Sequence, residues 1–190
     1  MFLGKETHAT TYRASVASEI LTIPAAEALR LRRAGVEMSS QMVGMIALMQ
    51  LLSQMPIFAN LSPQQIGALV KAMGRRRVEA RRAIIRQGEA RHHFYVIVEG
   101  QVAVSVRDET GQEKLVARLG RGEHFGETAL YTDQPYAATH WAQTQVELLT
   151  LDEPTFDKMA ASSAQTAHYV EQVSSARTID MQRKTVARKR

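Results

Sequence analysis

The 190-residue sequence contains no cysteine. This absence excludes disulfide bonds, thiolate zinc sites and cysteine nucleophiles, and it favours a reducing, cytoplasmic setting. The sequence also lacks a P-loop, a nucleophile elbow and a Rossmann glycine run. His92 and His93 are a tempting metal pair, but adjacent residues on a strand point to opposite faces. We therefore expect neither an enzyme nor a metal site.

Charged residues are missing from a long stretch of the chain, since none occurs between Met38 and Val70. The most apolar part, residues 42–52, is only 11 residues long, whereas a membrane-spanning helix needs roughly 20. The N-terminus has no basic region followed by an apolar core, so no signal peptide is expected. We predict no membrane span.

The uncharged stretch is rich in methionine. Met38, Met42, Met45 and Met49 follow the spacing i, i+4, i+7 and i+11, which predicts a helix over 36–55. Such a helix can pack on its own domain, or it can also bury against a second subunit, because methionine suits adaptable interfaces. We treat residues 35–56 as a linker helix that forms a homodimer, and the intramolecular interpretation stays open.

Between Arg77 and Leu151 the pattern is one of short strands. Runs of Val, Ile, Tyr and Phe are separated by glycines, and "RDETGQEK" is typical of a hairpin turn. Strands at this spacing without a long intervening helix predict an all-β sandwich or roll. Ser62 followed by Pro63 marks the start of a helix over about 63–73, and a further helix is expected over about 154–185.

These motifs resemble, in their order, those of cyclic-nucleotide-binding domains. They include Phe58 before the Ser62 helix start, "IIRQGE", "YVIVEGQVAV", "LGRGEHFGETAL" and "VELLTLDEPTF", within about residues 50–160. Such domains are the sensing modules of catabolite activator proteins, protein kinase A regulatory subunits and many channels. The resemblance implies a mainly β fold with flanking helices. We expect a jelly-roll-type β-roll of about eight strands over 57–160, N-terminal helices, and an exit helix with a basic tail over 161–190.

The resemblance also implies a phosphate-binding loop at 125–139. We therefore predict these ligand-binding residues: Phe125, Gly126, Glu127, Thr128, Ala129, Tyr136, Ala137, Ala138 and Thr139. Gly126 lets backbone N–H groups approach a phosphate, and a short helix from about Glu127 to Tyr131 would aim its N–H groups the same way. In the family the glutamate accepts hydrogen bonds from the ribose hydroxyl, and the alanine and threonine surround the phosphate and base.

No Lys or Arg occurs between Phe125 and Thr139. In ligand-binding members of the family the residue after the loop proline is an arginine, and here it is Tyr136. Tyrosine offers one neutral hydrogen bond in place of a bidentate charged contact. Losing a desolvated charge partner costs about 2–5 kcal/mol, or roughly 30- to several-thousand-fold in affinity. His140, where the family often has valine, is a second departure. Lys114 and Arg118 are interpreted as a solvated strand face.

Residues 1–34 repeat part of this pattern. "SEILTIP" superposes on "VELLTLD", and Tyr12 would then match Tyr136. We interpret 1–34 as the strand and helix that end a preceding, truncated copy of the domain, with chance similarity as the alternative.

The net charge of +5 raises the question of nucleic acid. Arginines cluster at 75–91 and the C-terminus "MQRKTVARKR" is basic, but no second apolar helix follows Phe156, as a DNA-reading helix-turn-helix would require. We expect no sequence-specific nucleic-acid binding. The basic tail is interpreted as a solvated helix end, with non-specific contact to nucleic acid or anionic lipid as the alternative.

The sequence thus predicts a regulatory, ligand-sensing module. Its expected ligand is cyclic AMP or cyclic GMP bound weakly, or another small anion, and its output is control of a fused or partner effector protein. The alternative is a ligand-blind scaffold domain that keeps the roll and dimerises through residues 36–55.

Overall fold

The computed structural model describes residues 40–108 and 110–186. The chain divides into two compact units, Met1–Ala47 and Leu48–Arg190, and the β-roll belongs to the second. The predicted truncated copy at 1–34 lies outside the described residues.

The described helices lie before, within and after a set of strands. The helices are α2 (Ser40–Ser53), the 3-10 helix η1 (Pro56–Phe58), α3 (Pro63–Ala72), α4 (Glu127–Thr132), α5 (Glu153–Ala161) and α6 (Ala164–Val186). The strands are β1 (Gly74–Val78), β2 (Ala83–Ile85), β3 (His93–Glu99), β4 (Val102–Arg107), β5 (Glu113–Leu119), β6 (His124–Phe125), β7 (Thr139–Ala142) and β8 (Val146–Asp152).

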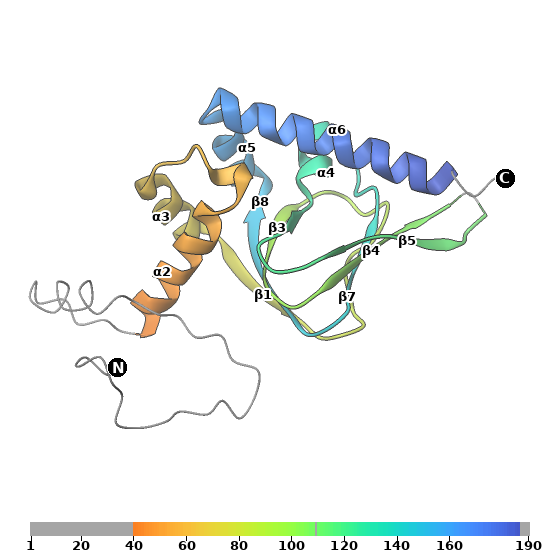
Figure 1. The fold of residues 1–190 in the computed structure, drawn as a ribbon, viewed down its shortest axis with the longest axis horizontal. Helices are drawn as coiled ribbons and strands as arrows, with labels where there is room; N and C mark the ends of the chain where they lie inside the picture. Colours follow the sequence, from red (N-terminus) through yellow and green to blue (C-terminus); the bar gives the residue numbers. More distant parts are fainter. Residues whose placement is uncertain (1–39, 109, 187–190) are drawn as a thin grey trace, which may run out of the picture. The chain divides into compact units, whose positions relative to one another are not determined.

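The strands form two four-stranded antiparallel sheets, in the orders β1-β8-β3-β6 and β2-β7-β4-β5 (Figure 1). In sequence, helix α4 lies between β6 of the first sheet and β7 of the second. The mainly β fold of about eight strands with flanking helices is confirmed, and so are the hairpin between β4 and β5 and the short helix after Gly126.

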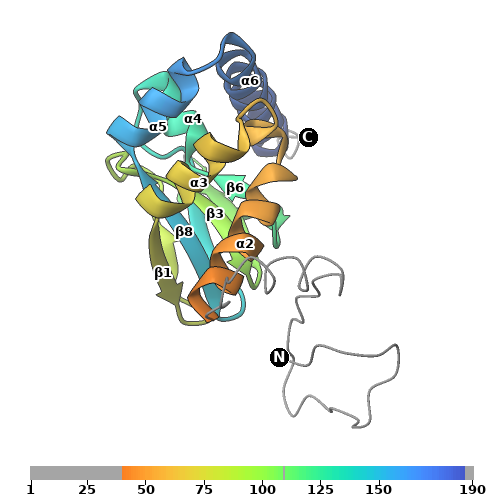
Figure 2. The ribbon, with the colours of Figure 1, turned by 90° about the vertical axis from the view of Figure 1, so that its left-hand side faces the viewer.

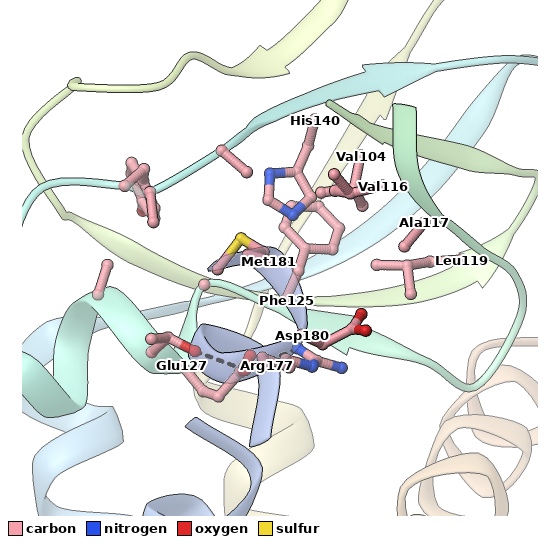
Figure 3. Close-up of a pocket in the computed structure, with 16 residues that line it drawn as sticks. Val104, Val116, Ala117, Leu119, Phe125, Glu127, His140, Arg177, Asp180 and Met181 are labelled. Atoms are coloured by element: carbon pink, nitrogen blue, oxygen red, sulfur yellow. Dashed lines mark hydrogen bonds and ion pairs between the residues drawn. The ribbon is translucent and has the colours of Figure 1, made fainter. Parts of the chain in front are cut away.

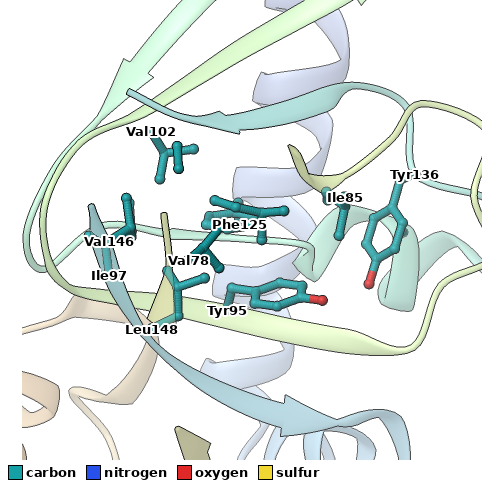
Figure 4. Close-up of a cluster of buried hydrophobic side chains, with 12 residues drawn as sticks. Val78, Ile85, Tyr95, Ile97, Val102, Phe125, Tyr136, Val146 and Leu148 are labelled. Carbon is teal, nitrogen blue, oxygen red and sulfur yellow. The ribbon is translucent and has the colours of Figure 1, made fainter. Parts of the chain in front are cut away.

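The core lies between the two sheets (Figure 4). Strand β3 is buried on both faces, which explains its unbroken apolar run. Tyr95 and Ile97 point into the roll, while Phe94 packs edge-on to Phe58 at 6.0 Å and against Phe156 at 5.4 Å between ring centroids. Helices α3 and α5 lie on this outer side of β3 (Figure 2).

The helix predicted from Ser62 is confirmed. The Ser62 side chain accepts from the Gln65 backbone and the Gln65 side chain accepts from the Ser62 backbone, a complete capping box. The prediction of a single helix over 154–185 is wrong, because the helix ends at Ala161 and a second helix begins at Ala164. There the Ser162 N–H and hydroxyl turn back to the Met159 carbonyl, and the Ser163 side chain accepts from Gln165 N–H to begin α6.

The predicted methionine helix is observed as α2. Within the second unit its C-terminal part is core, since Leu48, Leu51 and Leu52 are buried and the Met49 methyl lies beside Gly67 of α3. Dimerisation through this helix stays a prediction. In residues 40–108 and 110–186, no helix is both long and apolar enough to cross a bilayer.

Helix α6 runs alongside the roll and packs on α4, η1 and β5 (Figure 1). This packing places the middle of α6 opposite the 125–139 loop.

Candidate ligand-binding site

A cavity of about 100 Å³ lies between the loop, strands β4 and β5, and α6 (Figure 3). Of the predicted residues it is lined by Phe125, Gly126, Glu127, Thr128, Ala129, Tyr136, Ala137 and Ala138. The rest of the wall is formed by Val104, Val116, Ala117, Leu119, His140, Arg177, Asp180 and Met181. The structure therefore brings eight of the predicted residues to one cavity.

Thr139 does not line this cavity. Its hydroxyl accepts from the Gln87 N–H at 3.0 Å, and it faces a separate hollow beside Arg86 and Trp141. In this structure its role is to hold the 86–89 turn to the start of β7.

Gly126 is required where β6 meets α4. Its φ is +94°, a left-handed conformation that side chains disfavour. A Cβ at this position would lie 2.6 Å from the His93 carbonyl oxygen. Only glycine allows the loop to pass this close to β3, and the passage sets the direction of α4.

Glu127 is buried, with 1% of its surface exposed. Its carboxylate accepts from Thr128 Oγ1 at 3.1 Å, contacts His124 Nδ1 at 3.2 Å, and accepts from Arg177 Nη1 at 2.6 Å. Burial alone would raise the pKa of this carboxyl, but the His124 hydrogen bond and the Arg177 charge outweigh it and lower the pKa to about 2. Glu127 is therefore an ionised carboxylate that three side chains contact, one each from β6, α4 and α6.

Arg177 reaches Glu127 from the exit helix α6, 50 residues later in the sequence. It is the only Lys or Arg among the described residues that line the cavity. Sequence reasoning missed Arg177, Asp180 and Met181. Their i, i+3, i+4 spacing places them on one helical face, but no local signal tells which surface that face covers.

Tyr136 stands where ligand-binding members of the family have an arginine, and 5% of its surface is exposed. Its hydroxyl donates to the His93 carbonyl at 2.8 Å and accepts from the N–H groups of His92 and His93 at 3.2 and 3.0 Å. Its ring belongs to the core between the sheets, with Tyr95 and Ile85 (Figure 4). The hydroxyl is thus engaged by the backbone at the start of β3, and the residue supplies no charge to the cavity.

His140 lines the cavity with 9% of its surface exposed. Its ring stacks on Phe125 at 4.4 Å between centroids, and Phe125 stacks on Tyr95 at 4.8 Å. Burial lowers the pKa of His140 to about 4, although the charge of Glu127 and a backbone hydrogen bond with Ala138 oppose the shift, so the ring is neutral at pH 7. Its Nδ1 atom is buried without a hydrogen-bond partner.

The other basic candidates lie elsewhere. Lys114 is bonded to Asp108 at 2.7 Å, and neither Lys114 nor Arg118 lines the cavity. Arg91 pairs with Asp133 after α4 and with Glu153 at the start of α5, and so ties the loop to the exit helices. In the described part of the chain, no group of three His, Asp or Glu side chains is placed to hold a metal ion.

Residues 75–163 match the family model for the cyclic nucleotide-binding domain. The 125–139 loop lies within this match, the β-roll begins one residue before it at Gly74, and helix α6 follows it directly. This part of the chain belongs to the cyclic nucleotide-binding domain family.

Among curated proteins, the chain is similar to the cAMP-dependent protein kinase regulatory subunit of Yarrowia lipolytica. The two are 34% identical over 108 residues, which are 57% of this chain and 28% of that subunit. The chain thus corresponds to under a third of this relative.

Two solved structures extend the comparison. The sensor domain of the transcriptional regulator DNR from Pseudomonas aeruginosa is 25% identical with a TM-score of 0.63, covering 70% of this chain and 90% of that one. The regulatory subunit of a cAMP-independent protein kinase A from Trypanosoma brucei is 27% identical with a TM-score of 0.55, covering 76% and 57%. The latter structure is a triple variant bound to cAMP in its A site, and one of its substitutions introduces an arginine.

Proposed function

We propose that this domain is a regulatory ligand sensor whose affinity for cyclic AMP and cyclic GMP is weakened by Tyr136. The observation that carries the proposal is the engagement of the Tyr136 hydroxyl by the backbone of His92 and His93. A cyclic phosphate at the loop would therefore meet neither a guanidinium nor a free hydroxyl from this position.

The trypanosomal comparison supports the same reasoning. That subunit is described as cAMP-independent, and the variant solved with cAMP has gained an arginine. We infer that the presence or absence of an arginine beside the loop also decides whether this chain binds a cyclic nucleotide.

Isothermal titration calorimetry with cyclic AMP and cyclic GMP tests the proposal. We expect wild-type binding in the high-micromolar to millimolar range, and binding at least about tenfold tighter in Tyr136→Arg. Tyr136→Phe is the matched control, because it also loses the hydroxyl bonds to His93 but adds no cation. Low-micromolar affinity of the wild type would refute the proposal.

The controls also separate folding from binding. Both variants remove a buried hydrogen-bond partner of His93, which costs about 1–3 kcal/mol of unfolding free energy, so both should melt at lower temperature. Equal affinity of Tyr136→Arg and Tyr136→Phe, with both folded, would show that the missing charge is not the cause of weak binding.

The proposed output passes through α6. A ligand that engages Glu127 competes with Arg177 for the same carboxylate and so favours release of α6 from the loop. We propose that a fused or partner effector protein responds to this release.

A ligand-blind scaffold is the second candidate. The small cavity and the Arg177–Glu127 pair favour it, because the chain already satisfies its own binding carboxylate. If nucleosides, cyclic nucleotides and small anions all leave the melting temperature unchanged, the scaffold function is favoured over the sensor function.

A further inference from the structure

The outer face of the second sheet lies away from α3 and α5 (Figure 1) and carries the single tryptophan of the chain, Trp141. Along β7 the side chains of His140 and Ala142 are buried on the inner side, so Trp141 between them points outward. Its neighbours in register are Ala83 on β2 and Ala103 on β4, and no long side chain stands directly beside it on either strand. The indole is therefore a partly exposed aromatic group in the middle of a sheet face.

Two open hollows meet at this tryptophan. The first, of about 560 Å³, includes Arg81 and Leu115 in its lining, and the second, of about 490 Å³, includes Arg86. Trp141 and Glu113 line both hollows, and none of the lining residues belongs to a described helix. Leu115 is 50% exposed, so an aliphatic and an aromatic side chain are both available on the same surface.

Glu113 fixes the position of the indole. Its carboxylate accepts hydrogen bonds from the Ser105 hydroxyl and from Trp141 Nε1, the latter at 2.8 Å. These hydrogen bonds lower the pKa of Glu113, so the group is an ionised and already engaged carboxylate at neutral pH. An aromatic side chain that is held in advance loses little conformational entropy when a partner binds to it.

The arginines around the indole supply positive charge. Arg81 and Arg107 line the hollows. Arg118 lies on β5 between Ala117 and Leu119, whose side chains line the inner cavity, so its own side chain points to the outer face. Within the part of the chain that the structure describes, neither Arg81 nor Arg118 forms an ion pair.

The other charged residues of this region are paired. Asp108 is bonded to Lys114 at 2.7 Å. Arg86 lies 3.6 Å from Glu89, and because both side chains are exposed this pair contributes little. Glu113 is therefore the one carboxylate of the two hollows without a lysine or arginine bonded to it in the described structure, and the uncompensated arginines outnumber it.

We propose that this face docks an acidic segment of a partner protein, a segment that also presents one large apolar side chain. The apolar side chain packs on Trp141 and Leu115, while the carboxylates of the segment pair with Arg81, Arg107 and Arg118. Tryptophan and arginine are the residues enriched at interface hot spots, and guanidinium groups bind carboxylates in a bidentate manner. The site does not include the inner cavity, so the inference stands apart from ligand sensing.

Single-stranded nucleic acid fits the same face less well. Its bases need flat stacking partners, and the exposed Leu115 beside the indole is aliphatic. Glu113, in the lining of both hollows, would repel a phosphate backbone. The combination of aliphatic surface and arginine therefore favours an acidic peptide.

The fluorescence of Trp141 reports on binding at this face, because the chain has no other tryptophan. The probes are short peptides of Asp and Glu with a single Leu or Phe at the centre, titrated into the full chain. One control peptide has Ala at the centre, and the other has Asn and Gln in place of the acidic residues. We expect the probes to change the emission and to bind about tenfold tighter than either control, with an affinity that falls as salt rises.

Exposed positions allow the site to be located without loss of the fold. Leu115→Gln and Arg118→Gln should each weaken binding of the probe peptides about fivefold or more at unchanged melting temperature. The matched controls are Ile179→Gln on α6, where Ile179 is 49% exposed, and Arg75→Gln on β1, where the side chain is 60% exposed. Both controls should bind as the wild type does.

No binding of either probe up to about 1 mM overturns the proposal. Binding that the alanine-centred peptide matches, or that Leu115→Gln leaves unchanged, also overturns it. If oligothymidylate changes the Trp141 emission at lower concentration than the probes do, the face binds nucleic acid instead. If the emission of the protein alone changes with its concentration, and Leu115→Gln abolishes the change, the occupant is a second copy of the chain.

Discussion

Glu127 is ionised in the interior because Thr128, His124 and Arg177 surround its carboxylate. The arrangement differs from a surface ion pair, since the carboxylate is almost fully buried while about a third of the Arg177 side chain is exposed. Removing the cation leaves a buried charge, whereas removing both charges leaves a neutral hydrogen bond.

Arg177→Gln should therefore destabilise the fold. We expect a loss of about 2–4 kcal/mol, at or below the range for a fully buried pair because Arg177 is partly solvated. The double variant Glu127→Gln/Arg177→Gln should recover much of this loss. Urea unfolding checks both, and a single variant as stable as the wild type would mean that His124 alone suffices for Glu127.

Acid should destabilise the domain in two steps. The pKa of His140 is about 4 in the fold against 6.5 ordinarily, so stability is present above pH 6.5 and declines as pH falls toward 4. The pKa of Glu127 is about 2 against 4.5, so its contribution is present above pH 4.5 and declines below it. Thermal melts from pH 7.5 to 4 should fall in the wild type, and the decline above pH 4.5 should flatten in His140→Phe. An identical slope in the variant would contradict this assignment.

At the scale of secondary-structure elements, the close approach of the 125–139 loop to β3 depends on Gly126. Gly126→Ala must accept a φ of +94° and a Cβ 2.6 Å from the His93 oxygen, so we expect a loss of at least about 2 kcal/mol. Gly88→Ala is the matched control, because its φ is +83° and nothing lies within 4 Å of its Cβ, and about 1 kcal/mol is expected. Equal melting temperatures would show that backbone conformation alone, and not the contact with His93, sets the cost.

The elements that could be predicted from the sequence are those determined by a few adjacent residues. The Ser62 cap, the hairpin between β4 and β5 and the short helix after Gly126 each depend on a few adjacent residues, and each was predictable. The break before Ser163 was not, because serine is also compatible with a helix interior. Nor was the contact of Arg177 with Glu127, since it depends on how a 23-residue helix packs against a loop 50 residues earlier.

At the scale of the whole molecule, the methionine helix remains the predicted dimer element. Met49 lies beside Gly67 of the same chain, whereas Met42 is 39% exposed. We expect Met42→Asp to convert a dimer into a monomer at unchanged stability, and Met49→Asp to lower the melting temperature of the domain itself. Size-exclusion chromatography with light scattering distinguishes these outcomes. A wild type that is already monomeric at about 50 μM would refute the dimer.

The bond between Arg177 and Glu127 also affects the fraction of molecules in which the cavity is open to a ligand. If the cavity admits ligand only after this bond opens, the measured dissociation constant is the intrinsic one divided by the open fraction. An open fraction of about 1% would make an intrinsically micromolar site look about a hundredfold weaker. Any protein that holds α6 away from the roll would raise ligand affinity without touching the cavity, and ligand would in turn strengthen that protein's hold by the same factor.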